Sequence, residues 1–178
     1  MRPIYKYYRQ VLTKEDCDYL IKNGLNNLEV SKVSREIIPS KLLRKGKVSW
    51  IKPGEDKKSD EIVQKIVNLM FWEAEETHGV SLSKVENVQF AKYGILDHYN
   101  KHMDVGSDGT YRVLSAVVEL SDPKDYIGGG LNLYLAEKTH PIPFEQGTVV
   151  TFPSILPHKA KPVFWGNRYS LTLWGSRD

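Results

Sequence analysis

The chain has 178 residues, of which 40% are hydrophobic and 26% charged, and its formal net charge is +3 at pH 7. A chain of this size and composition can bury a core without disulfides, and its single cysteine, Cys17, excludes an internal one. No apolar run approaches the length of a membrane span, and the first ten residues lack the apolar centre of a signal peptide. We therefore expect a cytoplasmic protein without a membrane partner.

We expect one domain over residues 1–178, with helices and a loop in residues 1–84 and a β-rich core in residues 85–178. The first helix is predicted to begin at Thr13, because the acidic residues Glu15 and Asp16 follow within three positions. Apolar residues then recur at the spacing of a helix, which predicts one buried face.

A second helix is predicted to begin near Ser59 or Asp60 and to end at Gly79, since apolar residues follow one broad helical stripe between them. Residues 31–58 are polar and basic and lack a pattern except in residues 48–51, so we expect a mobile loop that closes over the substrate. Its basic residues leave two interpretations open, a surface for nucleic-acid phosphates and a solvated loop. These residues are Lys41, Arg44, Lys45, Lys47, Lys52, Lys57 and Lys58.

From residue 85 onward, short β-rich runs are separated by turns that contain glycine and proline. Short strands at even spacing are typical of a sandwich or barrel and not of alternating strand–helix units. We therefore predict an α+β, mainly β fold: a double-stranded β-helix (jelly roll) backed by N-terminal helices. The predicted strands cover residues 87–93, 111–120, 131–135, 148–152, 159–163 and 169–174.

Of the five histidines, His102 is distinguished by an acidic residue, Asp104, two positions later. On an extended strand, side chains two residues apart point to the same face, and a third ligand could come from a later strand, where His158 lies. Two imidazoles and one carboxylate leave three positions on a metal open, which is the arrangement of non-haem Fe(II) oxygenases. A closed, four-ligand zinc site has no such vacancy.

Several spaced motifs over residues 88–175 support this interpretation. They are Gln89-Phe-Ala-Lys-Tyr93, Tyr99-Asn-Lys-His102-Met-Asp104, Leu120-Ser-Asp-Pro with Gly128-Gly-Gly130, Gly147-Thr-Val-Val-Thr-Phe152-Pro-Ser, and Gly166-Asn-Arg168-Tyr-Ser170-Leu-Thr172-Leu-Trp174. In their order and spacing the chain resembles the prolyl 4-hydroxylase-like 2-oxoglutarate oxygenases, and the bacterial PKHD-type hydroxylases in particular. The resemblance implies a jelly-roll catalytic core in residues 85–178. It also implies a 2-oxoglutarate-dependent dioxygenase that hydroxylates prolyl residues of a peptide or protein and releases succinate and CO2.

By the same resemblance, His102, Asp104 and His158 would hold the iron. Arg168 would bind the distal carboxylate of 2-oxoglutarate, a role that suits its planar and permanently charged guanidinium. The other implied pocket residues are Tyr93, Ser170 and Thr172, as contacts of the cosubstrate, and Trp174, as part of the wall. The implied cofactors are Fe(II), 2-oxoglutarate and O2, with ascorbate as a further candidate.

Two positions stand apart from this pattern. Glu119 lies about where some relatives carry a second tyrosine for the cosubstrate, and His98 is a candidate to support the metal ligands. In the predicted substrate loop, Trp50 is the only large aromatic residue and could stack on a pyrrolidine ring, and the basic residues favour peptides with acidic groups near the target. Three other functions stay open: a nucleic-acid-directed oxygenase of the same chemistry, a catalytically silent jelly-roll binding module and a zinc hydrolase. The sequence does not determine the oligomeric state.

Overall fold

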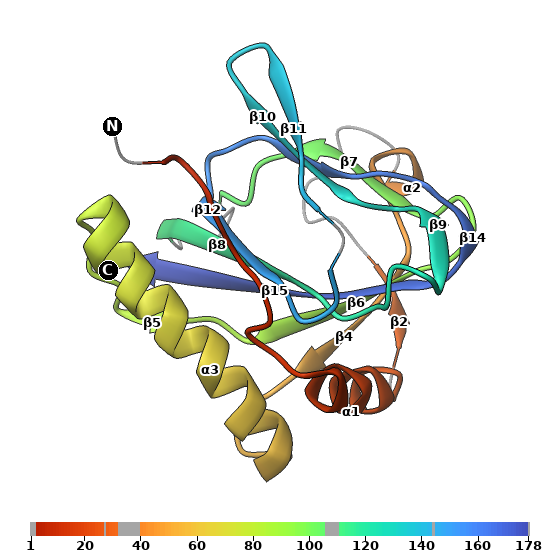
Figure 1. Cartoon of the computed structure of the whole chain (residues 1–178), viewed down its shortest axis with the longest axis horizontal. Helices are drawn as coiled ribbons and strands as arrows, with labels where there is room; N and C mark the ends of the chain where they lie inside the picture. The colour runs from red at the N-terminus through yellow and green to blue at the C-terminus, as the bar shows by residue number, and fades with distance from the viewer. Residues whose placement is uncertain (1–2, 27, 32–39, 106–110, 144, 178) are drawn as a thin grey trace.

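The computed structural model describes residues 3–26, 28–31, 40–105, 111–143 and 145–177. Two β-sheets face each other, and the smaller one lies above the larger one in Figure 1. Within the described residues, the ladders between strands are antiparallel. The mainly β class predicted from the sequence is therefore confirmed.

The larger sheet has eight strands in the order β1-β12-β8-β15-β6-β4-β2, with β5 paired to β15. Its strands are β1 (Lys6–Tyr8), β2 (Glu29–Val30), β4 (Lys47–Ile51), β5 (Lys84–Val85), β6 (Val88–Tyr93), β8 (Tyr111–Glu119), β12 (Val149–Pro153) and β15 (Arg168–Arg177). The smaller sheet has the order β11-β10-β13-β7-β3. Its strands are β3 (Arg44–Lys45), β7 (His98–His102), β10 (Leu131–Leu135), β11 (Lys138–Pro141) and β13 (His158–Ala160). A third, two-stranded sheet joins β14 (Val163–Gly166) to β9 (Tyr126–Gly128).

The helical segments are α1 (Lys14–Gly24), α2 (Ser40–Leu43), α3 (Lys57–Glu73) and the π-helical turn η1 (Ala74–His78). Helix α1 begins as predicted after Thr13, whose hydroxyl accepts a hydrogen bond from the Asp16 amide at 3.1 Å. The Asp16 carboxylate accepts one in return from the Thr13 amide at 3.2 Å. Such a reciprocal cap contributes about 1 kcal/mol.

The second predicted helix is also present as α3, and it begins at Lys57, two residues before Ser59. The carboxylate of Asp56 caps it by accepting a hydrogen bond from the Ser59 amide at 2.9 Å. The helix continues into η1 and stops at Gly79, whose φ of 64° lies in the left-handed region that favours glycine. The prediction that Gly79 ends this helix is confirmed.

Both long helices pack on one face of the larger sheet and lie below it in Figure 1. Cys17 of α1 and Ile66 and Met70 of α3 are fully buried in one apolar cluster with Phe90 of β6. Burial of a side chain such as Ile66 stabilises the fold by roughly 1.5–3 kcal/mol. At Gly24, an added Cβ would lie 2.3 Å from the Phe90 ring, so α1 approaches the sheet at a residue without a side chain.

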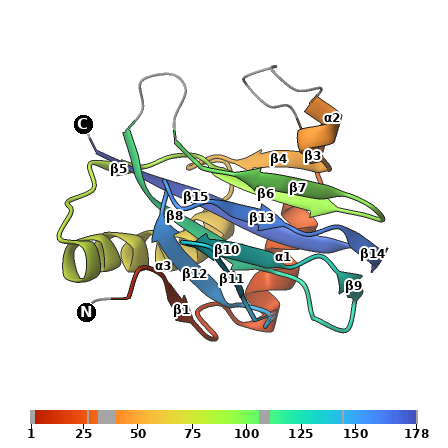
Figure 2. The same ribbon diagram turned by 90° about the horizontal axis from the view of Figure 1, so that it is seen from above.

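The mobile loop predicted for residues 31–58 is wrong for much of this range. Residues 40–43 form α2, residues 44–45 and 47–51 form β3 and β4, and residues 57–58 begin α3. The chain leaves the smaller sheet and enters the larger one at Gly46, and the two strands lie near each other at one end of the molecule in Figure 2. β4 pairs along its whole length with β6. This pairing with a distant strand decides the structure, because strand preference depends on neighbours more than on local pattern. Residues 32–39 of the predicted loop lie outside the described residues.

Five of the six predicted strands correspond to β6, β8, β10, β12 and β15. The sixth, predicted for residues 159–163, is divided between β13 and β14. At the break, the Lys161 amide donates to Gly130, at the end of the turn that precedes β10. Strand β7 has no apolar alternation, so a prediction from periodicity does not define it.

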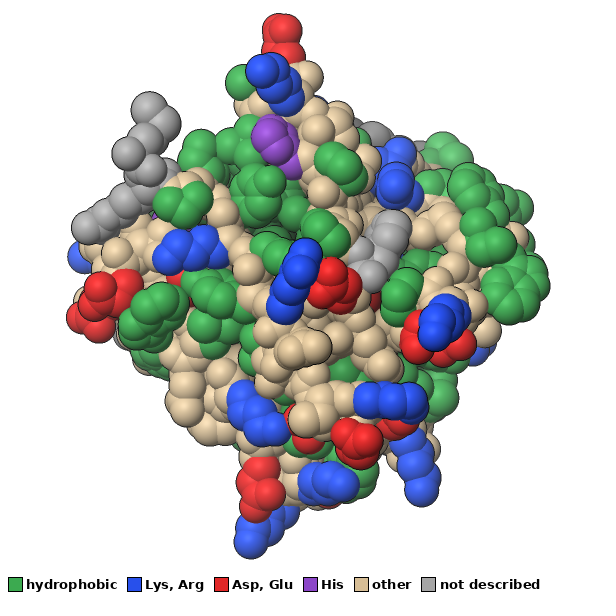
Figure 3. All heavy atoms as spheres, in the orientation of Figure 1, with side chains coloured by type: hydrophobic (Ala, Val, Ile, Leu, Met, Phe, Trp, Pro, Cys, Tyr) green, Lys and Arg blue, Asp and Glu red, His purple; other side chains and the backbone are tan. Residues whose placement is uncertain are grey.

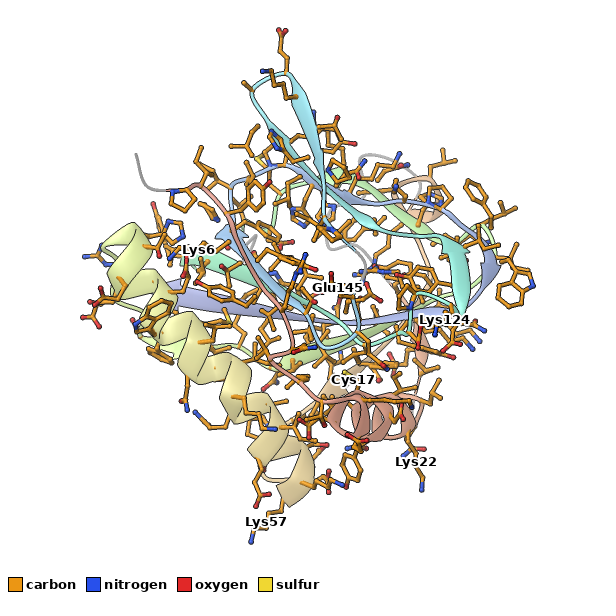
Figure 4. All side chains as sticks on the ribbon, viewed as in Figure 1. Lys6, Cys17, Lys22, Lys57, Lys124 and Glu145 are labelled. Atoms are coloured by element: carbon orange, nitrogen blue, oxygen red, sulfur yellow. The ribbon has the colours of Figure 1, made fainter. Side chains whose placement is uncertain are left out.

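Charged side chains of both signs are interspersed over the face shown in Figure 3, and Lys57 points away from the start of α3 in Figure 4. Within the basic stretch, Lys45 lies 3.4 Å from Asp97 and Lys52 lies 3.5 Å from Glu55, so part of its charge is offset locally. Among the described helices, none is long and apolar enough to cross a membrane.

Candidate metal centre and its pocket

The three predicted metal ligands come together between the two sheets. His102, at the end of β7, and His158, at the start of β13, are direct partners in the antiparallel ladder. Asp104 follows two residues after His102, and its carboxylate oxygens lie 3.5 Å from Nε2 of His102 and 3.4 Å from Nε2 of His158. The ligand atoms of all three residues lie within 4.8 Å of one another, which is the separation that one shared ion would bridge.

Hydrogen bonds at the back of each ligand fix its orientation. Nδ1 of His102 bonds the carbonyl oxygen of Asn100 at 2.8 Å, and Nδ1 of His158 bonds that of Leu156 at 2.9 Å. A carbonyl oxygen can only accept, so each Nδ1 carries the hydrogen and each Nε2 presents a lone pair to the centre. Partners of this kind orient metal ligands in many proteins.

The carboxylate of Asp104 has its own hydrogen-bond donor. The Ser115 hydroxyl of β8 donates to Oδ2 of Asp104 at 2.8 Å, and the Asp104 amide donates to the carbonyl oxygen of Ser154 at 2.9 Å. The carboxylate is therefore held from the larger sheet while the imidazoles are held from the smaller one.

The electrostatics of the cluster favour binding of a cation. Burial alone would raise the pKa of Asp104, but His158 and His102 hold it well below its ordinary value. Burial opposes protonation of His158, yet the Asp104 carboxylate raises the pKa of that ring, whereas burial lowers the pKa of His102. The carboxylate is thus ionised at neutral pH, and its negative charge between the two imidazoles favours a cation at the centre.

The donor set fits an iron(II) ion. Two imidazole nitrogens and one carboxylate oxygen on one side of an ion form the facial arrangement of non-haem Fe(II) oxygenases. Among the residues that the structure describes, no further histidine, cysteine or acidic residue joins this cluster. A closed structural zinc site, which needs four protein ligands, is therefore not formed by the described residues.

The triad opens onto a cavity that is lined by residues of both sheets. All the pocket residues predicted from the sequence line it: His102, Asp104, His158, Arg168, Tyr93, Ser170, Thr172 and Trp174. Four of these residues lie on β15, at positions 168, 170, 172 and 174. Alternate residues of a strand share a face, so their side chains point the same way. One inner face of one strand thus carries half of the predicted pocket.

Arg168 lies at the end of this row and is almost fully buried. Its Nε donates to the Glu119 carboxylate at 2.8 Å, and its guanidinium lies 5.8 Å from the centre of the Tyr93 ring. Burial would lower the pKa of Arg168, but Glu119, Tyr126 and Tyr93 raise it above its ordinary value, so the side chain remains protonated. An added Cβ at Gly129 would lie 3.0 Å from Arg168, which explains a glycine in this turn.

Three polar residues of the cavity were not predicted to lie at the metal site: Arg44 of β3, Gln89 of β6 and Tyr99 of β7. The Tyr99 ring stacks on His102 with centroids 3.4 Å apart and planes at 12°. Gln89 and Tyr99 belong to motifs that the sequence shows, but Arg44 is hidden within the basic stretch. Only the pairing of β3 with β7 turns it inward.

His98 has a different position from the predicted one. It is not among the residues that line the cavity, and its ring bonds the backbone carbonyl of Leu96 at 3.0 Å. The expectation that His98 supports the metal ligands is therefore wrong. The reason is the local geometry: His98 lies at the start of β7, where the strand pairs with Lys45 of β3, and His102 lies at its end.

The sequence profile of the 2OG-Fe(II) oxygenase superfamily matches residues 88–176, half of the chain. A PKHD-type hydroxylase of Prochlorococcus marinus is 34% identical over 92 residues, which cover 51% of this chain and 42% of that protein. Among solved structures, the fold is similar to a Pseudomonas putida prolyl-4-hydroxylase, with a TM-score of 0.79, 23% identity, and coverage of 98% of this chain and 93% of the other. A prolyl hydroxylase from Trichoplax adhaerens, in complex with a hypoxia inducible factor peptide fragment, has a TM-score of 0.78, 20% identity, and coverage of 97% and 83%.

The chain therefore belongs to the 2OG-Fe(II) oxygenase superfamily. The matched profile begins with β6 and ends within β15, so it includes the metal triad and Arg168. The chain matches less than half of the length of the Prochlorococcus relative.

Proposed function

We propose that the chain is an Fe(II)- and 2-oxoglutarate-dependent dioxygenase that hydroxylates a prolyl residue in a peptide or protein. The observation that carries this proposal is the meeting of two sites in one cavity. The His102–Asp104–His158 cluster can hold the metal, and Arg168 offers a buried guanidinium on the same cavity wall. With both groups bound, O2 would oxidise 2-oxoglutarate to succinate and CO2, and one oxygen atom would enter a C–H bond of the substrate.

Different residues would position the metal and the cosubstrate. His102, Asp104 and His158 would hold the metal, which would supply the site for O2 activation. Arg168 receives the distal carboxylate of the cosubstrate with two parallel N–H groups, while its Nε stays on Glu119. Ser170 and Thr172 lie between Arg168 and the metal end of the β15 row, where their hydroxyls can donate to the cosubstrate.

The prolyl substrate is supported by an exposed aromatic residue that packs against the cavity wall, as well as by the relatives. Trp174 lines the cavity, and its ring centre lies 6.3 Å from that of Trp50, which is 47% exposed. The guanidinium of Arg112 covers Trp174 at 4.2 Å and bonds Glu86, so the Trp174 ring is fixed in place. Trp50 is the exposed indole of this pair, and its apolar ring offers a surface on which a pyrrolidine ring can pack.

The test is purification without oxygen, followed by addition of Fe(II), 2-oxoglutarate and O2, with and without ascorbate. We expect formation of succinate that is stimulated by a prolyl peptide, and mass spectrometry should detect addition of one oxygen atom to that peptide. His102→Ala and His158→Ala should abolish succinate formation in folded protein. Absence of succinate under all conditions would support the silent binding module instead, and succinate formation without any active peptide would remove the prolyl assignment alone.

A further inference from the structure

Arg44 is a buried cation on the cavity wall that has no ionic partner among the described residues. Only 8% of the residue is exposed, and among the described residues no carboxylate lies within ion-pair distance of its guanidinium. One terminal nitrogen donates to Oε1 of Gln89 at 2.7 Å, whereas Nε has no hydrogen-bond partner in the part of the chain that the structure describes. Burial of an arginine without a compensating charge is costly, so proteins retain it where a ligand supplies the charge.

The other arginine of the cavity, Arg168, differs in this respect. Its charge is already offset by Glu119 at 2.8 Å. Both side chains line the same cavity. Of its two guanidinium groups, that of Arg168 is neutralised, and that of Arg44 has no counter-charge in the described parts of the chain. The uncompensated charge of Arg44 is the stronger attraction for an anion that enters.

The position of Arg44 is fixed from two sides. It is the cross-strand partner of Tyr99, and its guanidinium lies over that ring at 4.6 Å. The His102 imidazole covers the Tyr99 ring at 3.4 Å, so steric exclusion puts Arg44 against the opposite face of the ring. The bond to Gln89 then ties Arg44 to the larger sheet. A guanidinium that is stacked and bonded in this way loses little entropy when it binds a ligand.

We propose that Arg44 determines substrate specificity by binding a carboxylate of the molecule that is hydroxylated, close to the reacting C–H bond. This inference rests on the proposed function, in which both carboxylates of 2-oxoglutarate have partners, the metal and Arg168. The anion left for Arg44 then belongs to the substrate. The substrate class is thus an acidic peptide, in which the carboxylate comes either from an aspartate or glutamate side chain beside the target residue or from the end of the chain.

Calorimetric titration of the protein loaded with Mn(II) and 2-oxoglutarate, without oxygen, measures this binding separately from turnover. The probes are pairs of prolyl peptides that differ only in a carboxylate: Asp against Asn next to proline, and a free against an amidated C-terminus. The wild-type protein is expected to bind the acidic member of at least one pair about tenfold or more tightly, as a charge-assisted hydrogen bond predicts. The pair that responds identifies the source of the carboxylate.

Arg44→Gln should abolish that preference and leave the affinity for 2-oxoglutarate within about twofold. Arg44→Lys keeps the charge but loses the planar fork, and it should lose most of the preference too. Lys45→Gln is the matched control, because it removes the same charge from the next residue, which is exposed and does not line the cavity. Thermal unfolding of each variant verifies folding, and if Arg44→Gln does not fold, Arg44→Lys decides.

Three results would overturn the inference: equal affinity of the wild-type protein for both members of every pair, a preference that survives in both Arg44 variants, or a large loss of 2-oxoglutarate affinity in Arg44→Gln. An Arg44-dependent preference without succinate formation would refute only the proposed function. Succinate formation without any carboxylate preference would refute only the role of Arg44.

Discussion

Arg168 donates a hydrogen bond from Nε to the Glu119 carboxylate at 2.8 Å, and both side chains are more than nine-tenths buried. Arg168, which is proposed to bind the cosubstrate, is therefore already paired with a protein carboxylate when no ligand is bound. Glu119 serves the free protein, because it offsets a buried charge, but it also competes with an incoming dianion for the same guanidinium. Stability of the free protein and affinity for 2-oxoglutarate are thus opposed at this pair.

Glu119→Gln is expected to destabilise the ligand-free protein by about 3 kcal/mol, because it leaves the Arg168 guanidinium without a counter-charge. The same variant should bind 2-oxoglutarate roughly tenfold more tightly, since the ligand then supplies the missing charge. Urea unfolding and calorimetric titration measure the two effects. Glu145→Gln is the control, because Glu145 pairs with Arg9 at the surface. An unchanged affinity in Glu119→Gln would mean that Glu119 does not compete with the cosubstrate.

Arg168→Ala is expected to weaken 2-oxoglutarate binding about a hundredfold or more, as loss of a desolvated charge partner predicts. Its affinity for the metal alone should stay within about threefold of wild type, because Arg168 contacts none of the metal ligands. The variant leaves Glu119 buried without a partner, so the double variant Arg168→Gln/Glu119→Gln separates loss of binding from loss of stability. If the double variant binds 2-oxoglutarate as the wild type does, Arg168 has no part in holding it.

The His102–Asp104 pair could be predicted from the sequence because a spacing of two residues puts both side chains on one face of extended backbone, although β7 ends at His102 and Asp104 lies just beyond it. His158 and the row from Arg168 to Trp174 could be predicted through the resemblance to the prolyl 4-hydroxylase-like oxygenases. Arg44 could not, because its neighbours in the basic stretch are of the same chemical type and only the ladder with Tyr99 distinguishes it. The same holds for β4, which is a strand because it pairs with the distant strand β6. No local sequence pattern shows such a long-range pairing.

Ser115→Ala is expected to weaken Fe(II) or Mn(II) binding by about 10–100-fold, because the Ser115 hydroxyl orients the Asp104 carboxylate through a 2.8 Å hydrogen bond. Metal titration of the protein after removal of bound metal with a chelator measures the change. Ser176→Ala is the matched control: Ser176 is also buried and donates to a carboxylate, that of Glu86, away from the metal. Equal metal affinities in all three proteins would exclude an orienting role for Ser115.

Cys17 is expected to react with thiol reagents only when α1 leaves the sheet. Its side chain is fully buried, and burial raises the pKa of the thiol to about 12. At pH 8 the thiolate fraction is then about a thousandfold lower than for a free cysteine, and access is blocked as well. The labelling rate in buffer and in urea, followed by mass spectrometry, measures this difference. Fast labelling of the folded protein would show that α1 opens readily.

Asp56 is expected to make stability depend on pH through the cap of α3. Its carboxylate accepts hydrogen bonds from the Ser59 amide at 2.9 Å and from Tyr19 of α1 at 3.0 Å, and the bonds from Ser59 chiefly lower its pKa. A carboxyl group whose pKa is lower in the folded state stabilises the protein above the pKa of the unfolded chain, about 4, and loses this effect as the pH falls through the folded value. Asp56→Ala should therefore lower the thermal midpoint by several degrees at pH 7, and its difference from wild type should shrink steadily as the pH falls below about 4. Asp56→Asn retains a capping side chain and should lose less at pH 7, and Glu55→Ala, which removes an adjacent exposed carboxylate, should show no such trend. A difference between wild type and Asp56→Ala that stays constant from pH 7 to about 3 would contradict the role of the ionised cap.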